Sequence, residues 1–290
     1  MNKPAAEIDL SVAEVRLLLS GQHAQFAHLP ITRGPSGWDN AIFRLGADLA
    51  VRLPRREAAA RLLEHEQRWL PRLAPRLPLP VPAPICVGLP SGKFPWHWSV
   101  TPWFEGETLD RSPASGEQIE VLTSFLQALH QPAPAEAPLN PWRGIALAQK
   151  QTRFEECALD YENRNGALDP RLRRIWDQAV RTPIDMLPTW IHGDLHPRNV
   201  LVRDGRLSAV IDWGDMAQGD RACDLAATWM LLPQAHERER LMSQYPSASN
   251  PTWSRARGWA LLVALVVLRS GDPDHQETGQ ATLRRLLDGP

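Results

Sequence analysis

Apolar residues recur every three or four positions in two early stretches, residues 9–20 and 57–73, and this spacing predicts two amphipathic helices. Between them, residues 41–45 and 49–53 are short apolar runs separated by Gly-Ala-Asp at 46–48, a pattern typical of two strands joined by a tight turn. The first hundred residues are therefore predicted to form a small α+β unit.

Proline dominates the next stretch, residues 71–95, where eight prolines exclude a long helix and favour extended segments and turns. Beyond residue 106 helical spacing returns, so this part of the chain is predicted to be mainly helical. The two parts are expected to join near residues 98–104. The predicted helices of the second part are 117–130, 145–159, 170–180, 225–232, 255–270 and 281–287.

A compact β-hairpin is predicted to interrupt these helices, because the runs 200–202 and 207–211 flank an Asp-Gly turn at 204–205. In an antiparallel hairpin the residue before the first strand lies beside the residue after the second. Asn199 and Asp212 are therefore expected to meet at the open end of the hairpin. Their amide and carboxylate oxygens are hard ligands suited to Mg²⁺, which completes its shell with water and phosphate oxygens.

Asp194 precedes this hairpin and would stand beside such a metal ion. Its carboxylate can accept or orient a hydroxyl proton, the role needed when an alcohol attacks a terminal phosphate. A lone aspartate before a strand is more often a cap or a loop residue. The assignment of Asp194 therefore depends on its occurrence together with Asn199 and Asp212. Five residues separate Asp194 from Asn199, the spacing of the aspartate and the asparagine in kinase catalytic loops.

The composition fits an ordinary globular protein of 290 residues, with 43% apolar and 22% charged residues, enough for one large or two modest cores. The 32 basic and 33 acidic residues nearly balance, and nucleic-acid binding relies on a positive excess, so no nucleic-acid partner is expected. The three cysteines lie far apart without a CxxC pattern, which argues against a disulfide framework or a zinc site.

No membrane partner is expected either. The N-terminus lacks the apolar core of a signal peptide, and the longest apolar run is residues 259–268. That run is about half of the ~20 residues that a bilayer span needs. We therefore expect a cytoplasmic protein with reduced thiols.

Two segments together resemble the signature of the aminoglycoside phosphotransferase family: His-Gly-Asp-Leu-His-Pro-Arg-Asn at residues 192–199 and Ile-Asp-Trp-Gly-Asp at 211–215. Weaker similarity extends over residues 31–259. The resemblance implies a protein-kinase-like α+β fold with two lobes. A small β-rich N-lobe, residues 1–103, would bind the nucleotide. A larger, mainly helical C-lobe, residues 104–290, would carry the catalytic loop, the metal site and the acceptor site.

By this resemblance Asp194 is the catalytic base, and Asn199 and Asp212 hold Mg²⁺. The donor would be ATP, with GTP as an open alternative, and the acceptor a hydroxyl of a small molecule, an aminoglycoside or other antibiotic or a metabolite. Residues 140–181, expected to cover the acceptor, carry charges of both signs and do not favour a polycation. The alternatives are a nucleotide-binding pseudokinase with a regulatory role and, less favoured because the interval 215–224 is short, a protein kinase.

A kinase N-lobe holds the nucleotide phosphates with a cation on its third strand, paired to a glutamate on the following helix. The candidates for this pair are Arg52 and Glu66. The family normally has lysine at the strand position, so Arg52 departs from the family pattern. Arginine keeps the positive charge of lysine but changes the geometry of the contact with phosphate. Alternatively, Arg52 decorates a strand edge and Glu66 pairs with a local arginine.

Two further segments are candidates for the nucleotide site. Ser36 and Gly37 lie in a glycine-containing loop, residues 33–40, that suits the phosphates, with a plain turn before a strand as the equal alternative. The chain around Pro102 and Phe104 resembles the family's hinge, in which the Pro102 carbonyl and the Phe104 N–H would recognise adenine.

His192 and His196 have the i,i+4 spacing of a helical zinc site, but Gly193 and Pro197 disfavour a regular helix there. A structural role in the loop is favoured for both histidines, and a phosphate or substrate contact by His196 stays open. Asp224, by analogy with the family, would bond backbone N–H groups of the catalytic loop and so support the base.

Asp215 and Asp220 are candidates for contacts with substrate amines, while solvent exposure or helix capping is the favoured role of Asp220. Most of the twelve tryptophans are expected in the core. Trp38 and Trp103 lie nearer the predicted nucleotide site than the others.

Overall fold

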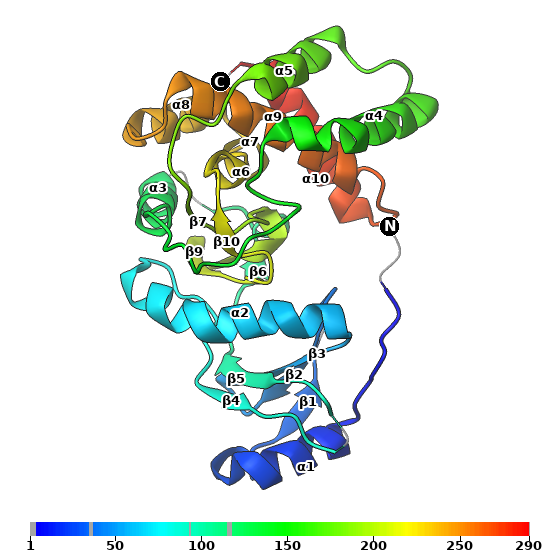
Figure 1. Ribbon diagram of the computed structural model, residues 1–290, viewed down its shortest axis with the longest axis vertical. Helices are drawn as coiled ribbons and strands as arrows, with labels where there is room; N and C mark the ends of the chain where they lie inside the picture. Colours follow the sequence, from blue (N-terminus) through cyan, green and yellow to red (C-terminus); the bar gives the residue numbers. More distant parts are fainter. Residues whose placement is uncertain (1–3, 35–36, 93, 115–117, 290) are drawn as a thin grey trace.

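The computed structural model describes residues 4–34, 37–92, 94–114 and 118–289 of the chain. The first part consists of α1 Val12–Gln22, β1 Ile31–Arg33, β2 Asn40–Leu45, β3 Leu49–Pro54, α2 Glu57–Leu73, β4 Cys86–Gly88 and β5 Trp98–Pro102. Its five strands form one antiparallel sheet in the order β1-β2-β3-β5-β4. The sheet lies between α1 and α2, and α2 faces the rest of the molecule (Figure 1).

Strands β2 and β3 form the hairpin predicted from the Gly-Ala-Asp turn. Leu45 pairs with Leu49 across that turn, where Gly46 has φ 64°, a left-handed conformation that glycine adopts without strain. Phe43 and Leu45 are fully buried and share the core of this part with Leu19 of α1. The two predicted helices and the two predicted strands of the first part are confirmed.

The second part contains two small sheets and the remaining helices. Its strands are β6 Glu107–Thr108, β7 Thr189–Ile191, β8 Val200–Arg203, β9 Arg206–Val210 and β10 Ala217–Gly219. Its helices are α3 Ile119–Leu129, α4 Gln151–Asn165, α5 Pro170–Arg181, α6 Ala222–Leu225, α7 Ala227–Leu231, α8 Ala235–Gln244, α9 Asn250–Val267 and α10 Pro273–Leu287. Strands β6, β8 and β9 form one antiparallel sheet, β7 and β10 the other, and both lie on the side toward α2 (Figure 1).

The predicted helices of the second part are present, with three differences and one omission. The stretch 145–159 begins as a short 3₁₀ turn, Leu147–Lys150, before α4 starts, and the stretch 225–232 is divided between α6 and α7. The stretch 281–287 is only the C-terminal part of α10, which begins at Pro273. Helix α8 is absent from the predicted set, because its charged sequence buries only Arg238 and Leu241 and shows little apolar spacing.

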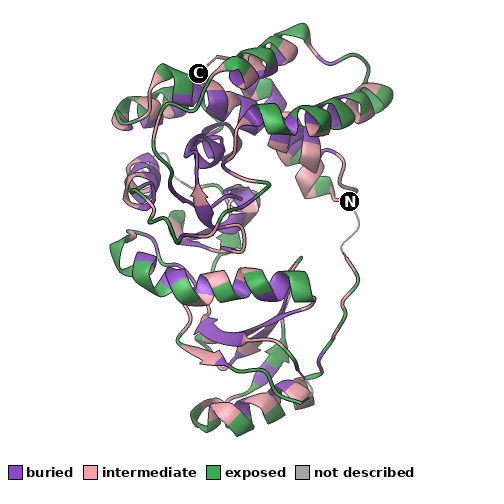
Figure 2. Cartoon of the chain, in the orientation of Figure 1, coloured by how far each residue is buried: buried purple, intermediate pink, exposed green. Residues whose placement is uncertain are grey.

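A large apolar core holds the second part together. Trp213 and Trp259 are among its fully buried side chains, and buried residues concentrate on the inner faces of the helices (Figure 2). The expectation that most tryptophans serve packing is confirmed. The exceptions with large exposed rings are Trp38 and, unexpectedly, Trp142, which is 69% exposed.

The predicted α+β architecture, with a small β-rich first part and a larger, mainly helical second part, is confirmed. The three cysteines are free thiols, as expected. Within the described ranges, no helix combines the length and the apolar character needed to cross a membrane.

Candidate active site

The hairpin formed by β8 and β9 carries two candidate residues at its open end. The Ile211 N–H donates to the Asn199 carbonyl at 2.9 Å. A β-bulge after Leu201 shifts the register by one residue and places Ile211, rather than Val210, opposite Asn199. Asp212 therefore lies one residue beyond the partner of Asn199, which corrects the predicted pairing. Asp212 comes next with φ 60°, a left-handed conformation uncommon outside glycine that turns the chain away from β9.

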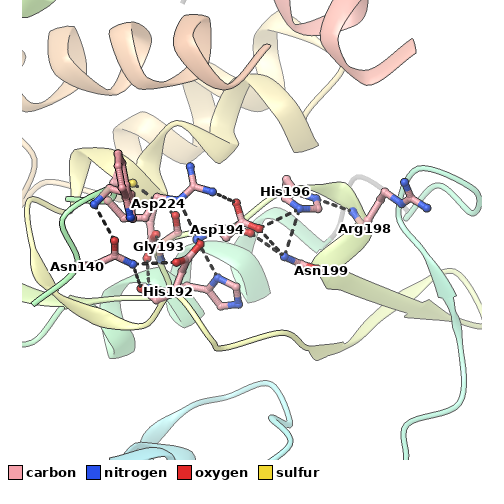
Figure 3. A network of polar contacts seen from close by, with 12 residues as sticks. Asn140, His192, Gly193, Asp194, His196, Arg198, Asn199 and Asp224 are labelled. Carbon is pink, nitrogen blue, oxygen red and sulfur yellow. Dashed lines mark hydrogen bonds and ion pairs between the residues drawn. The ribbon is translucent and has the colours of Figure 1, made fainter. Parts of the chain in front are cut away.

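The loop between β7 and β8 is anchored by the buried Asp224 (Figure 3). The Asp224 carboxylate accepts hydrogen bonds from the N–H groups of His192 at 2.6 Å and Gly193 at 2.8 Å, and lies 3.2 Å from the His130 ring. Burial opposes ionisation of Asp224, but the hydrogen bond and charge of His130 outweigh it, so the pKa is lowered. The backbone of the loop is therefore fixed by a buried anion.

The two histidines of this loop bind its own backbone. His192 Nδ1 accepts the Asp194 N–H at 3.2 Å, and its Nε2 lies 3.0 Å from the Ile211 carbonyl, so the ring joins the loop to the end of β9. His196 Nδ1 accepts the Arg198 N–H at 3.2 Å, and its Nε2 lies 3.3 Å from Asp194 Oδ2. Both rings thus help to shape the loop, and His196 also contacts the candidate base.

The Asp194 side chain is held by charged and polar neighbours (Figure 3). Arg143 Nη2 donates to Asp194 Oδ1 at 2.7 Å, and Asn199 Nδ2 donates to the Asp194 carbonyl at 2.8 Å. Burial would raise the pKa of this carboxyl, but Arg143 and His196 outweigh burial and hold the pKa of Asp194 well below its usual value. Asp194 is therefore an ionised carboxylate fixed in one position.

Arg52 lies in the middle of the first sheet, on β3 between Ile42 of β2 and Ser99 of β5. Its guanidinium bonds both carboxylate oxygens of Glu66 on α2, with Nη2 to Oε1 at 3.0 Å, and the two side chains are only 8% and 2% exposed. Burial lowers the pKa of Arg52, but the Glu66 charge outweighs burial, so the pKa is raised. The alternative in which Arg52 decorates a strand edge is therefore wrong.

The candidate phosphate loop joins β1 to β2, so it is the connection of a hairpin. The Gly34 N–H donates to the Ile42 carbonyl at 2.9 Å. Gly37 lies in this loop, while Ser36 falls outside the described residues. Asp39 at the end of the loop forms an ion pair with Arg56 at the start of α2. That pair joins the loop to the helix that carries Glu66.

The candidate hinge follows the end of β5. Pro102 is the last residue of that strand and pairs with Leu49. Trp103 donates its N–H to the Asp48 carbonyl at 2.8 Å, whereas the Phe104 N–H meets no acceptor within the described chain. Phe104 is thus the first residue after β5 whose backbone N–H has no hydrogen-bond partner within the described chain.

Comparison with known proteins places these features in a family. Residues 30–259 match the model of the phosphotransferase enzyme family, APH. The chain belongs to this family. The family predicted from the two signature segments is therefore confirmed.

Among characterised relatives of this APH chain, an Escherichia coli aminoglycoside 3'-phosphotransferase is 29% identical over 170 residues, which cover 54% of this chain and 61% of the relative. A thiamine kinase of Escherichia coli O157:H7 (strain EC4115 / EHEC) is 26% identical over 281 residues, covering 93% of this chain and 92% of the relative. The aminoglycoside relative is therefore matched over about three fifths of its length.

Solved structures of APH enzymes share the fold. The GDP complex of aminoglycoside 2'-phosphotransferase-IIIa superposes with a TM-score of 0.68 at 18% identity, covering 96% of this chain and 99% of that chain. The macrolide 2'-phosphotransferase MphH of Brachybacterium faecium gives a TM-score of 0.58 at 22% identity, covering 94% and 97%. The predicted kinase-like fold is thus confirmed.

One residue outside the APH signature segments, Arg143, joins the site. Besides Asp194 it bonds Asp215, from Nε to Oδ2 at 3.2 Å, and Asn140 Nδ2 donates to the same carboxylate at 2.8 Å. Asp215, a candidate for substrate amines, is therefore already paired. Arg143 and Asn140 belong to no motif, and Arg143 lies 51 residues from Asp194 in the sequence. Only the fold reveals that they meet.

Asp220 also differs from the expectation. Its carboxylate is buried and bonds the Arg255 guanidinium, at 2.6 Å to Nε and 3.1 Å to Nη2. It also accepts the Ala222 N–H at 3.1 Å, at the start of α6. Solvent exposure of Asp220 is wrong, because the buried ion pair occupies both oxygens. The N-cap residue of α6 is Arg221, so Asp220 precedes the cap position.

The donor set at the end of the hairpin fits Mg²⁺. Asp212 is exposed, and within the described chain no side chain donates a hydrogen bond to its carboxylate. Desolvation by the surrounding protein raises the pKa of Asp212, Arg52 acts against the rise and Asp194 adds to it, so a cation there would be favourable. Asn199 turns its Nδ2 to the Asp194 carbonyl, which leaves its Oδ1 for another partner.

A protein-only metal cage is not part of this arrangement. In the described ranges, no group of three or more His, Cys, Asp or Glu side chains is placed to hold a metal ion. Mg²⁺ does not need one, because it is usually bound through one or two protein carboxylates together with waters and substrate phosphates. Asp212 and Asn199 are of the right chemical type for that mode.

Replacing Arg143 by Gln is expected to lower kcat about 10- to 100-fold, because the charge-assisted bond that fixes Asp194, worth about 1.5–3 kcal/mol, is lost. The dissociation constant for nucleotide should stay unchanged, since the ion pairs of Arg143 within the described ranges are to Asp194 and Asp215 and none is to Arg52. Steady-state kinetics and calorimetric titration measure the two quantities. Arg171→Gln, at an exposed ion pair with Asp169, is the charge-matched control. An unaltered kcat in Arg143→Gln would contradict a positioning role.

Proposed function

We propose that this protein transfers the γ-phosphate of ATP to a hydroxyl group of a small molecule. The observation that carries the proposal is the Asp194 carboxylate, which Arg143 and His196 hold in an ionised state. It lies in the loop that carries the APH signature and is anchored by Asp224. Membership of the APH family supports the same reaction class. GTP is the alternative donor, because solved relatives include complexes with GDP and with ADP.

Asp194 would orient the attacking hydroxyl by accepting its hydrogen bond. As the acceptor oxygen bonds to the γ-phosphorus, the bond from that phosphorus to the ADP oxygen breaks, and the hydroxyl proton passes to Asp194 and then to solvent. Because the pKa of Asp194 is lowered, its main contribution is orientation rather than early removal of the proton. Most of the rate would come from positioning and electrostatics.

The nucleotide is assigned to the first part, residues 1–103, and the acceptor and metal sites to residues 104–290. Arg52, fixed by Glu66, would bind the phosphates through its guanidinium, which matches phosphate oxygens in pairs. Asn199 and Asp212 would hold Mg²⁺, which when bound neutralises phosphate charge. The fit of these two donors and the influence of Arg52 on Asp212 support this placement.

Two further contacts complete the proposed nucleotide site. The loop that contains Ser36 and Gly37 would cover the phosphates with its backbone N–H groups. The Pro102 carbonyl and the Phe104 N–H, which has no hydrogen-bond partner among the described residues, would bind the edge of the adenine ring. The hinge-like position of both residues at the end of β5 supports the assignment.

The acceptor is proposed to be a small hydroxyl compound, a metabolite or an antibiotic. Relatives named for aminoglycosides and for thiamine show how varied the acceptors of similar chains are. Asp215 is already paired with Arg143. It is therefore not a free carboxylate that could bind an amine of an aminoglycoside polycation. We place the activity in the cytoplasm, where ATP is supplied, with no nucleic acid or membrane as a partner.

A panel of antibiotics and metabolites incubated with γ-labelled ATP and Mg²⁺ tests the proposal. The expected result is label on at least one small hydroxyl compound, detected by chromatography and dependent on the enzyme. Thermal stabilisation by Mg²⁺-ATP without transfer to any acceptor would instead favour a pseudokinase. Label on added proteins, with none on small molecules, would favour a protein kinase.

A further inference from the structure

Trp142 lies in a turn before α4, residues 140–144, that is fixed on both sides of it. The Asn140 side chain accepts the Trp142 N–H at 2.8 Å through Oδ1 and donates to Asp215 Oδ1 at 2.8 Å through Nδ2 (Figure 3). Gly144 closes the turn with φ 63°, a left-handed conformation that glycine adopts without strain. The Trp142 ring is nevertheless 69% exposed. The backbone of the turn is thus held in place while its largest side chain lies in solvent.

The same turn contacts the candidate base. Arg143, the residue after Trp142, donates to Asp194 Oδ1 at 2.7 Å and to Asp215 Oδ2 at 3.2 Å. The side chains of Arg143 and Asp194 are 26% and 28% exposed, so a ligand can reach both. Within the described chain the Arg143 Nη1 has no hydrogen-bond partner. Trp142 therefore lies beside the space in which an acceptor hydroxyl would meet Asp194.

A buried lysine supports the Trp142 ring from one side. The Lys150 Nζ lies 4.4 Å from the ring centroid and donates to the Pro141 carbonyl at 3.2 Å. Lys150 is 7% exposed, and among the described residues it forms no ion pair with a carboxylate. Burial lowers the pKa of Lys150 and the charge of Arg143 lowers it further, so the two cations lie near each other. A single exposed apolar side chain needs no explanation, but a buried charge placed against it does.

The charges around the ring disfavour a cationic ligand. A cation is attracted to the electron-rich face of an aromatic ring, and Lys150 already lies over one face of Trp142. A second cation on the opposite face would be repelled by Lys150 and by Arg143. The carboxylates that contact the turn, Asp194 and Asp215, are both paired with Arg143. An uncharged ring can stack on the exposed face without this repulsion.

We propose that the exposed face of Trp142 binds a planar, uncharged ring of the acceptor, with Asn140 and Lys150 positioning the indole. A hydroxyl on a short side chain of that ring would then reach Asp194, so the substrate class is an aromatic alcohol. The identification of the ligand as the acceptor rests on the proposed phosphotransfer, whereas binding of a planar ring at Trp142 does not.

Fluorine NMR of protein labelled with fluorotryptophan tests the ring site in the absence of ATP. The resonance of Trp142 is identified by its loss in Trp142→Phe, and that of Trp38, the other tryptophan with a large exposed ring, in the same way. Benzyl alcohol, the uncharged aromatic probe, should shift the Trp142 resonance in a saturable manner and leave the Trp38 resonance unchanged. No saturable shift at Trp142, or an equal shift at both positions, would overturn the proposal.

Two further probes test the planarity and the charge of the ligand. Cyclohexylmethanol matches benzyl alcohol in carbon number but is not planar, and benzylammonium carries a charge on the same ring. Both should bind at least about threefold more weakly than benzyl alcohol when the Trp142 resonance is titrated. Equal binding of cyclohexylmethanol would refute stacking on the indole. Equal or tighter binding of benzylammonium would refute the assignment of an uncharged ring.

Lys150→Met tests the contribution of the lysine through selectivity rather than stability. Methionine retains an unbranched apolar side chain but removes the charge from the inner face of the ring. The affinity for benzylammonium relative to benzyl alcohol should rise at least about threefold, because the opposing cation is gone. Loss of a merely structural residue would weaken both probes alike. An unchanged ratio would therefore contradict the positioning of Lys150 against a ligand-binding ring.

Kinetics separates the acceptor assignment from the proposed function. For an acceptor found in the labelled-ATP panel, Trp142→Ala should raise the acceptor KM at least about tenfold while the KM for ATP stays constant. Trp142→Phe should keep the acceptor KM within about threefold of the wild type, because a planar ring remains. Leu187→Ala, which also removes an exposed apolar side chain, is the matched control and should change neither KM.

The two proposals fail in different ways. If no acceptor is ever phosphorylated but benzyl alcohol binds at Trp142, the proposed function fails and the ring site stands. If transfer occurs and Trp142→Ala leaves the acceptor KM unchanged, the inference fails and the function stands.

Discussion

Replacing Asp194 by Asn is expected to reduce phosphoryl transfer by about 10²–10⁴-fold, the range of general base catalysis. The amide retains the size of the side chain but offers a weaker acceptor, so the acceptor hydroxyl loses both its orientation and its proton acceptor. Arg143 keeps its second partner, Asp215, and the loop keeps its anchor, Asp224. Nucleotide affinity and melting temperature should therefore stay close to those of the wild type. Single-turnover transfer of labelled phosphate measures the loss.

The matched control is Asp204→Asn in the turn of the same hairpin. Asp204 is largely exposed and has φ 53°, a conformation that asparagine also tolerates. Its substitution should leave turnover unchanged. Transfer by Asp194→Asn at the rate of this control would remove Asp194 from the chemistry and with it the proposed mechanism.

Replacing Arg52 by Met is expected to destabilise the protein by about 3–5 kcal/mol, because Glu66 remains buried without its partner. The double variant Arg52→Met/Glu66→Met should recover most of that loss, since two apolar side chains of similar volume need no partner. Both variants should bind nucleotide poorly, because each lacks the cation assigned to the phosphates. Chemical denaturation and nucleotide titration give the two readouts.

Arg52→Lys separates the phosphate contact from stability. Lysine keeps the charge and is a common phosphate binder, but it loses the paired hydrogen bonds to Glu66. Transfer within about tenfold of the wild type is expected, together with a modest loss of stability. If the double variant binds Mg²⁺-ATP as tightly as the wild type, Arg52 is a structural residue alone and the nucleotide assignment is refuted.

The sequence by itself determined the elements and the order of the signature residues. Helix α2, the β2–β3 hairpin and the β8–β9 hairpin follow from spacing and turn residues that act within a few positions of one another. The distance from Asp194 to Asn199 is also a local property. Even here tertiary context altered a detail, since the bulge after Leu201 places Ile211 rather than Val210 opposite Asn199.

Only the tertiary structure decided which distant side chains meet. The contact of Arg143 with Asp194 spans 51 residues, and that of Arg255 with Asp220 spans 35. No local pattern records such contacts, because ion pairs form wherever packing brings charges together, and burial removes the water that would otherwise solvate them. The charge state of the candidate base is thus a property of the fold.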